Sequence, residues 1–226
     1  MHIRAIVCDV GHVIVQESVL NHVLQALGRR GAMRVLYDMD VLAGAAEEDV
    51  ERWVEGVIRE KLKAMAGVRL AELQQLACEL PLTPGLPELV GRCQQAGVAV
   101  MLMGAVPTFL TRAMVMNRAP GVDKIVGTEI AEEDGHLAGA SVVCTPLRKA
   151  AAVQAWLAEK RVAPMATAVI GDSIGDLPTM GLVPKPNRFA FNAHPDVVAK
   201  AGHSDVGSML GIMRRIFGHG CPYGFI

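Results

Sequence analysis

Short apolar runs alternate with segments of helical periodicity from Leu86 to the end of the chain, and this alternation constrains the fold more than any other feature. Apolar runs typical of buried strands occupy residues 98–103, 167–170 and 189–191. Helical spacing of apolar residues is found between them, at 86–95, 108–116, 148–160, 196–201 and 208–216. Strands and helices that alternate in this way form parallel sheets with helices on both faces. We therefore predict an α/β fold.

The segment from residue 17 to residue 80 departs from this alternation. It follows a first apolar run at residues 3–8 and repeats apolar side chains at helical spacing, with glycines at 28, 31, 44 and 67 between the repeats. A chain of 226 residues is long enough for one large domain that carries a small insert. We predict a core domain made of residues 1–16 and 81–226, and a domain of three or four helices at 17–80.

Composition excludes several classes of function. The formal net charge is -1, which does not support nucleic-acid binding. The five cysteines are scattered and form no CxxC pair, which indicates a reducing compartment and no structural zinc. No apolar run approaches 18 residues, so we expect no signal peptide, no membrane span and a cytoplasmic protein. The last segment, residues 219–226, is expected to tuck against the core.

Three aspartates follow the ends of two predicted strands. Asp9 ends the first apolar run, and Asp172 and Asp176 follow the run at 167–170 in the segment Gly171-Asp172-Ser173-Ile174-Gly175-Asp176. Parallel sheets bind ligands at the carboxyl ends of their strands. Carboxylates that lie close together need a cation, and Mg²⁺ prefers such oxygen ligands together with a substrate phosphate. A helix cap would explain one of these aspartates but not all three.

These motifs resemble the haloacid-dehalogenase-like superfamily, and specifically its phosphoserine-phosphatase-like branch, over nearly the full chain. The first motif of the family is an apolar strand that ends in Asp-x-Asp-Gly-Thr, and Asp9 matches its first aspartate. Lys149 matches the lysine that opens a helix in the third motif. Gly171, Asp172 and Asp176 match the fourth motif, Gly-Asp-x-x-x-Asp. The resemblance implies a three-layer Rossmann-like core with a helical cap at 17–80.

The resemblance also implies a mechanism and a set of site residues. Asp9 would attack a phosphoryl group and form an aspartyl-phosphate, while Lys149 would stabilise the phosphoryl oxygens. Mg²⁺ would be held by Asp9, Asp172, Asp176 and the backbone carbonyl of Gly11. In phosphoserine phosphatases, a glutamate and an arginine of the cap bind the amino acid. Glu17 lies near the first of these positions, and Lys61 is nearer by spacing to the second than Arg59 is.

Two positions depart from the family pattern. Gly11 stands where the family has a second aspartate, which protonates the leaving group, and Val13 stands where it has threonine. A variant first motif, Asp-x-Gly-x-Val-Ile, occurs in some members of the superfamily and is similar to this stretch. The neighbouring His12 could donate a proton or be an ordinary loop residue.

The second departure lies after the run at 98–103. Gly104 stands where the family has a serine or threonine that binds the phosphoryl group, so the backbone of Gly104 or Ala105 would have to replace that hydroxyl. Thr108 follows a few residues later. The loss of one hydrogen bond to a charged group costs about 1.5–3 kcal/mol.

Three functions remain open. The first is a Mg²⁺-dependent phosphatase that acts on a small phosphorylated metabolite, without nucleic-acid or membrane partners and with a homodimer left open. The second is a catalytically impaired protein of the same fold with a binding or regulatory role, which Gly11 and Gly104 favour. The third is displacement of a leaving group other than phosphate, as in dehalogenases. The retained carboxylates favour the first, because a decayed site has no reason to maintain three of them at one sheet edge.

Overall fold

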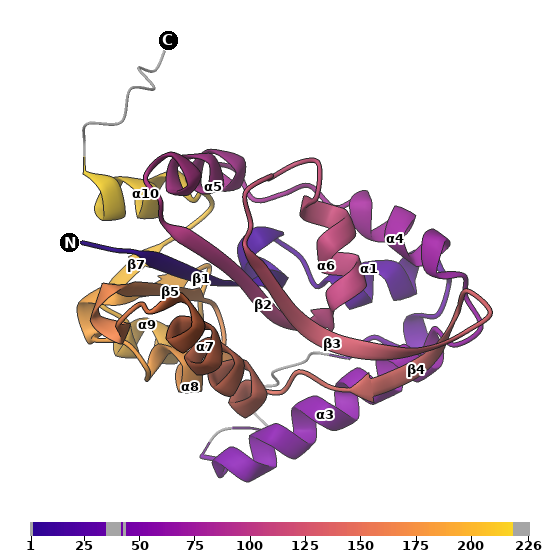
Figure 1. The fold of residues 1–226 in the computed structure, drawn as a ribbon. Coiled ribbons are helices and arrows are strands. Elements are labelled where there is room, and N and C mark those ends of the chain that lie inside the picture. The colour runs from indigo at the N-terminus through magenta and orange to yellow at the C-terminus, as the bar shows by residue number, and fades with distance from the viewer. Residues whose placement is uncertain (1, 35–41, 43, 219–226) are drawn as a thin grey trace.

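A seven-stranded sheet forms the centre of the protein in this computed structural model, which describes residues 2–34, 42 and 44–218 (Figure 1). Its strand order is β4-β3-β2-β1-β5-β6-β7, and every neighbouring pair is parallel except β3 and β4. The strands are β1 (Ala5–Asp9), β2 (Ala99–Pro107), β3 (Lys124–Glu133), β4 (His136–Val142), β5 (Thr167–Gly171), β6 (Arg188–Phe191) and β7 (His203–Asp205). The predicted α/β class is thus confirmed.

Helices cover both faces of this sheet and make a three-layer, Rossmann-like core (Figure 1). One face packs against α5 (Leu86–Gln95), α6 (Thr108–Val115) and α10 (Leu210–Phe217). The other packs against α7 (Pro146–Lys160), α8 (Leu177–Met180) and α9 (Pro195–Lys200). Successive residues of a strand point to opposite faces, which is why the central strands β1, β2 and β5 are largely apolar.

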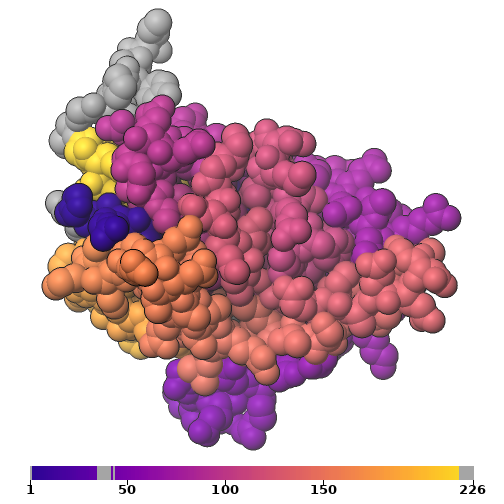
Figure 2. All heavy atoms as spheres, viewed as in Figure 1, coloured from indigo at the N-terminus to yellow at the C-terminus, as the bar shows by residue number. Residues whose placement is uncertain are grey.

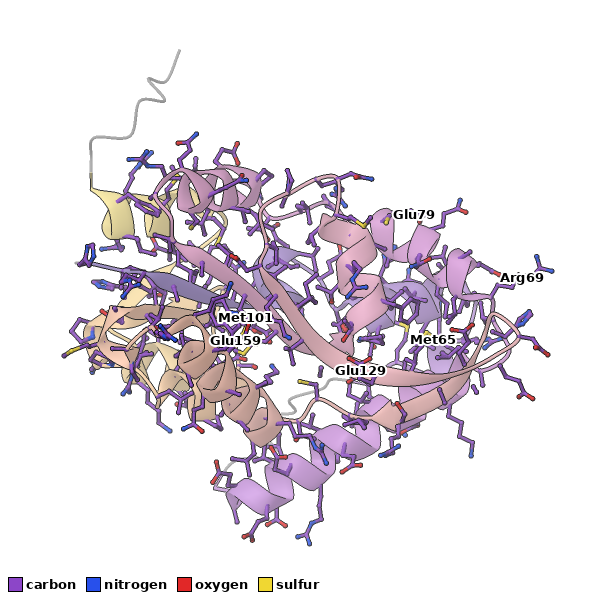
Figure 3. All side chains as sticks on the ribbon, viewed as in Figure 1. Met65, Arg69, Glu79, Met101, Glu129 and Glu159 are labelled. Atoms are coloured by element: carbon purple, nitrogen blue, oxygen red, sulfur yellow. The ribbon has the colours of Figure 1, made fainter. Side chains whose placement is uncertain are left out.

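The two apolar clusters show this alternation along β1. Ile6 and Cys8 belong to the cluster under α5, α6 and α10, whereas Ala5 and Val7 belong to the cluster under α7, α8 and α9. Met101 of β2 is fully buried in the second cluster. Polar side chains outside the sheet, such as that of Arg69 before α4, extend from the surface instead (Figure 3). Burial on both faces accounts for the Val and Ile content of these strands.

Residues 17–80, called the helical insert below, contain α1 (Val19–Ala26), α3 (Glu47–Ala64) and α4 (Leu70–Cys78), with a short helical turn at Arg30–Ala32. The two chain segments that lead into and out of the insert lie side by side, because Val15 and Leu82 form an antiparallel bridge. Figure 2 shows the insert in purple beside the pink residues of the β3–β4 hairpin. The division into two domains stays a prediction.

The insert is joined to the sheet by backbone hydrogen bonds as well as by apolar contacts. The amides of Gly67 and Leu70 donate to the carbonyls of Leu137 and Gly135 on the β3–β4 hairpin. The guanidinium of Arg59 also donates to the carbonyl of Ala140, at 2.9 Å. The insert therefore packs against both the hairpin and the apolar cluster beneath α5, α6 and α10.

Most of the predicted elements are present, with two differences. The sequence predicts a short strand that starts at Ile125 and a hairpin turn at residues 132–135. The turn is present, but β3 is longer than predicted, because its ten residues continue into the pairing with β4. β7 was not predicted, since its three residues His203–Asp205 include no apolar side chain. The predicted packing of residues 219–226 lies outside the described residues. Among the described residues, no helix is long and apolar enough to cross a membrane.

Candidate active site

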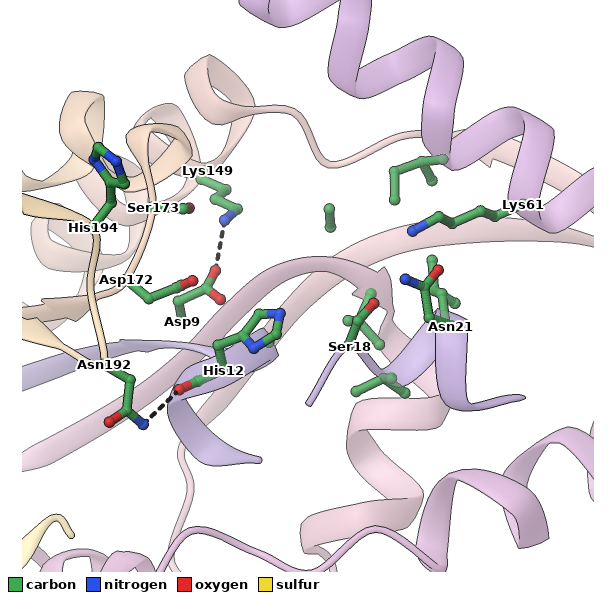
Figure 4. A pocket seen from close by; sticks show the side chains of 16 residues that line it. Asp9, His12, Ser18, Asn21, Lys61, Lys149, Asp172, Ser173, Asn192 and His194 are labelled. Carbon is green, nitrogen blue, oxygen red and sulfur yellow. Dashed lines mark hydrogen bonds and ion pairs between the residues drawn. The ribbon is translucent and has the colours of Figure 1, made fainter. Parts of the chain in front are cut away.

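The ends of β1 and β5 bring Asp9 and Asp172 to the same edge of the sheet. β1 and β5 are parallel neighbours in which Cys8 pairs with Ile170, so the residues that follow each strand emerge together. Lys149 enters from the first turn of α7, which follows the β3–β4 hairpin. Figure 4 shows Lys149 and Asp172 on either side of the Asp9 carboxylate. The tertiary structure thus brings together three of the residues predicted from the motifs.

Lys149 is the electrostatic centre of this cluster. Its side chain is buried, and its Nζ donates to Asp9 Oδ1 at 2.6 Å and to Asp176 Oδ1 at 3.1 Å. A buried ion pair is stabilising only when its remaining polar atoms are also bonded. Both partners here are themselves buried, so the lysine holds two carboxylates in one arrangement.

Asp176 organises the loop that carries Asp172. Its Oδ2 accepts hydrogen bonds from the amide of Asp172 at 3.1 Å, the amide of Ser173 at 3.2 Å and the Ser173 hydroxyl at 3.1 Å. Gly171 permits this packing, because a Cβ at that position would lie 2.6 Å from the Cβ of Asp176. The glycine of the Gly-Asp-x-x-x-Asp motif is therefore required by the close approach of Asp176 to the end of β5.

The cluster carries more negative than positive charge. Asp9, Asp172 and Asp176 each offer an oxygen, and the three oxygens lie within 4.8 Å of one another. Burial and, to a smaller extent, the charge of Asp176 raise the pKa of Asp9 to about 7, against the opposing effect of Lys149. Burial and the charge of Asp176 also raise the pKa of Asp172 well above its usual value. A divalent cation would relieve this repulsion, and the all-oxygen donor set fits Mg²⁺.

The turn after β1 places no acid beside Asp9. Gly11 has ordinary backbone angles (φ -67°, ψ 138°), and a Cβ there would meet only Asp9 Oδ2, at 4.0 Å. His12 adopts the left-handed conformation (φ 57°), and its carbonyl accepts a hydrogen bond from Asn192 Nδ2 at 3.3 Å. The His12 side chain is exposed and lines the cavity described below.

The end of β2 has no hydroxyl at the position where the family pattern has one. A Cβ on Gly104 would lie 3.0 Å from the Cβ of Val10, so a serine or threonine at this position would require Val10 to shift by a few tenths of an ångström. Ala105 lines the cavity, whereas Gly104 is not among its lining residues. Thr108 donates to Glu129 Oε1 at 2.8 Å. Of the two predicted positions, Ala105 is therefore the one at the cavity.

A cavity of about 460 Å³ lies between this cluster and the helical insert. That volume is within the range of small-molecule sites. The insert contributes Lys61 and Ile58 from α3, and Val19, Leu20 and Asn21 from α1. Figure 4 shows Lys61, Asn21 and Ser18 on one side of the cavity and Asp9, Lys149 and Asp172 on the other. We call these two sides the insert end and the aspartate end.

The two charged residues predicted from the insert differ in position. Lys61 lines the cavity and is buried, whereas Glu17 is exposed and is not among the lining residues. Arg59 is directed elsewhere, because it pairs with Glu55 and with the carbonyl of Ala140.

Five polar residues to which the sequence analysis gives no role also line the cavity: Ser18, Asn21, Ser173, Asn192 and His194. Asn192 has φ 49° and follows β6 directly, so its place at a strand end was the available signal. Asn21 has no comparable signal, since it is a polar residue inside a helix.

Comparison with known proteins identifies a matching family model and similar proteins of known name. A family model described as haloacid dehalogenase-like hydrolase matches residues 6–181. A phosphoserine phosphatase of Polaromonas sp. (strain JS666) is 23% identical over 185 residues, which span 79% of this chain and 75% of that protein.

Solved structures agree with the fold. A hydrolase of the same family from Salmonella enterica serovar Typhi superposes with a TM-score of 0.80 at 14% identity, over 97% of this chain and 73% of the other. A phosphoserine phosphatase solved with bound substrate superposes with a TM-score of 0.78 at 14% identity, over 96% of this chain and 99% of the other.

Proposed function

Because the chain belongs to the haloacid dehalogenase-like hydrolases, we propose that it is a Mg²⁺-dependent phosphatase that hydrolyses a small phosphorylated metabolite. One observation carries the proposal: Asp9, Asp172 and Asp176 converge around a buried lysine at the edge of the sheet. The resemblance to the phosphoserine-phosphatase-like branch supports the same reaction class.

In the proposed reaction, a carboxylate oxygen of Asp9 attacks the phosphorus atom. The bond from phosphorus to the ester oxygen breaks, and the alcohol leaves with a proton from solvent. Water then attacks the aspartyl-phosphate and releases inorganic phosphate and the Asp9 carboxylate. Lys149 keeps the Asp9 carboxylate in place through Oδ1 and contributes positive charge near the transferred group.

Asp9 and Asp172 would hold Mg²⁺, because both line the cavity. When bound, the ion supplies positive charge for the phosphoryl oxygens. Asp176 has a different role in this proposal, since its two oxygens already accept hydrogen bonds from Lys149 and from residues 172 and 173. The carbonyl of Gly11 remains a further candidate ligand on the basis of the family resemblance.

The helical insert would act as the cap that closes this site, with Lys61 as its contact to the substrate. The names of the relatives suggest phosphoserine as a substrate to test. In this chain the position of Glu17 outside the cavity argues against the amino acid contact that a cap glutamate makes.

A second function is favoured by one specific observation. Gly11 provides no carboxyl group beside Asp9, and general acid–base catalysis typically contributes about 10²–10⁴-fold to a rate. A protein that binds a phosphorylated ligand without turning it over would be consistent with that loss.

Hydrolysis of p-nitrophenyl phosphate and of a panel of alkyl phosphomonoesters, with Mg²⁺ and with a chelator, tests the proposal. We expect turnover that requires Mg²⁺ and falls at least about 100-fold in Asp9→Asn. Asp49→Asn is the matched control, because Asp49 is an exposed aspartate on α3. Binding of phosphate esters without turnover of any of them would support the second function instead. Equal turnover by wild type and Asp9→Asn would exclude the proposed nucleophile.

A further inference from the structure

The insert end of the cavity contains a buried lysine, Lys61, that is bonded to no carboxylate among the described residues. Only 1% of Lys61 is exposed, and Lys61 lines the cavity. It forms no hydrogen bond or ion pair with any other residue that the structure describes. Lys149, which is equally buried, is bonded to two carboxylates. A buried ammonium group normally has such a partner, because its desolvation is otherwise uncompensated.

Burial affects the ionisation of Lys61. Desolvation lowers the pKa of Lys61 to about 8, and the neighbouring Glu60 opposes this shift. The side chain is therefore mostly charged at neutral pH and lies next to a cavity large enough for a ligand. An anionic group on that ligand would supply the missing partner.

Asn21 offers an unused acceptor at the same end of the cavity. Its Nδ2 donates to the carbonyl of Arg34 at 3.3 Å, which fixes the orientation of the amide. Its Oδ1 is buried and accepts no hydrogen bond. A buried polar atom without a partner is costly, so a donor on the ligand would be favoured here.

In the part of the chain that the structure describes, no acidic side chain lines this end of the cavity. Among the described residues that line it, the only carboxylates are Asp9 and Asp172, and both lie at the aspartate end. Val19, Leu20 and Ile58 of the insert add apolar surface to the lining of the cavity. Lys61 and Asn21 at the insert end can thus neutralise an anion and accept one hydrogen bond, but none of the described residues there offers a negative charge to an ammonium group.

We propose that the cavity selects phosphorylated hydroxy acids over phosphorylated amino acids. The substrate carboxylate pairs with Lys61 Nζ, a hydroxyl group donates to Asn21 Oδ1, and the phosphate lies at the aspartate end. This assignment rests on the proposed phosphatase activity. An amino acid would bring an ammonium group close to Lys61 with only a neutral amide to receive it, so its desolvation and the like-charge repulsion would both oppose binding.

Matched substrates test the selectivity. The first pair is 3-phosphoglycerate and O-phosphoserine, which differ only in a hydroxyl against an ammonium group, and both enantiomers of each are used. The second pair, 2-hydroxy-4-phosphobutanoate and O-phosphohomoserine, is one carbon longer. We expect kcat/KM to favour the hydroxy acid at least about tenfold in one or both pairs.

Two variants assign that preference to residues. Lys61→Met is expected to raise KM for the hydroxy acid at least about tenfold. The substitution should lower kcat/KM for the hydroxy acid more than it lowers kcat/KM for p-nitrophenyl phosphate. Lys63→Met is the matched control, because Lys63 is an exposed lysine two residues away on α3. Asn21→Asp keeps the size of the side chain and adds a negative charge, so the preference is expected to shift toward the amino acid.

The outcomes separate this inference from the phosphatase itself. Turnover of p-nitrophenyl phosphate without turnover of any of the four acids would overturn the inference and leave the phosphatase standing. Equal kcat/KM within both pairs, a preference for the amino acids, or a wild-type KM in Lys61→Met would also overturn it. If no phosphomonoester at all is hydrolysed, the proposed function fails, and the inference fails with it.

Discussion

The two buried lysines of this protein lie at opposite ends of one cavity and differ in whether a carboxylate of the protein is bonded to them. At the aspartate end, Lys149 is bonded to Asp9 and Asp176, so the protein itself supplies the negative charge. At the insert end, Lys61 has no bonded partner among the described residues. We infer that the first lysine belongs to machinery that is preorganised before a ligand arrives, whereas the second depends on the ligand for its counter-charge.

Removal of the paired lysine should have the largest effect. Lys149→Met leaves the buried carboxylates of Asp9 and Asp176 without an internal cation, so we expect a loss of about 3–5 kcal/mol in the free energy of unfolding without metal. We also expect turnover to fall at least about 100-fold. Urea unfolding with and without Mg²⁺ measures the first effect. Lys160→Met on the same helix is the control, since the Lys160–Asp123 pair is partly exposed and should contribute less than about 1 kcal/mol. Equal stabilities of the two variants would contradict the comparison.

Addition of an acid at the aspartate end should have the next largest effect. Gly11→Asp fits the structure, because the backbone angles are ordinary and a Cβ would meet only Asp9 Oδ2 at 4.0 Å. We expect hydrolysis of alkyl phosphates to rise about 100-fold, as a proton becomes available to the leaving alcohol. p-Nitrophenyl phosphate should gain much less, because its leaving group needs no proton.

Gly11→Asn separates acid catalysis from a change in shape. This variant has nearly the same size but cannot donate a carboxyl proton. An equal gain in Gly11→Asn and Gly11→Asp, or an equal gain on both kinds of ester, would contradict the assignment of the missing acid to position 11.

The pH dependence of stability should differ with and without Mg²⁺. Burial raises the pKa of Asp9 from 3.8 to about 7, so the folded state binds this proton more tightly than the unfolded state does. The metal-free protein should therefore lose stability, by a few kcal/mol, as the pH rises from 4 to 8. Mg²⁺ should stabilise the protein more at pH 8 than at pH 5, because it competes with that proton.

Thermal unfolding across this pH range, with Mg²⁺ and with a chelator, measures the effect. Asp9→Asn should flatten the metal-free profile, since its side chain does not titrate. An Mg²⁺ stabilisation that is independent of pH would argue against a metal site at these carboxylates.

The smallest effect should come from the unpaired lysine and should have the opposite sign. Burial lowers the pKa of Lys61 from 10.5 to about 8, so the folded state binds this proton less tightly than the unfolded state. Lys61→Met should therefore raise the free energy of unfolding at pH 7 by about 1–2 kcal/mol, and the gain should diminish between pH 8 and pH 10.5. Urea unfolding at pH 7 and at pH 10 is the measurement. A loss of stability in Lys61→Met would mean that this lysine has a structural partner.

The agreement between sequence and structure is greatest where one apolar run forms one strand. β1, β2, β5 and β6 were expected because buried parallel strands carry apolar residues on both faces. β7 was missed because a short edge strand needs no such run. The hairpin turn at residues 132–135 was expected from its turn-forming residues, whereas the ten-residue length of β3 exceeded the short strand expected there.

The aspartate end could be expected from the sequence, and the insert end could be expected only in part. Asp9 and Asp172 follow strands of a parallel sheet, so their convergence follows from topology. Lys61 was selected only by its spacing, together with Glu17, and the structure directs one of them into the cavity and leaves the other exposed. Helical periodicity predicts which residues share a face, but it does not predict what that face will meet.

The sequence by itself determined the layered α/β fold, the position of the helical insert and the set of carboxylates at one edge, because local patterns and chain order specify all three. Only the tertiary structure decided that Ala105 lines the cavity while Gly104 packs against Val10. It also decided that Asp176 accepts hydrogen bonds both from Lys149 and from the amide of Asp172 in its own loop. The same is true of Lys61, whose burial beside Asn21 depends on how α1 and α3 pack over the sheet. Side-chain partners arise from contacts between segments far apart in the chain, and such contacts leave no periodic signal in the sequence.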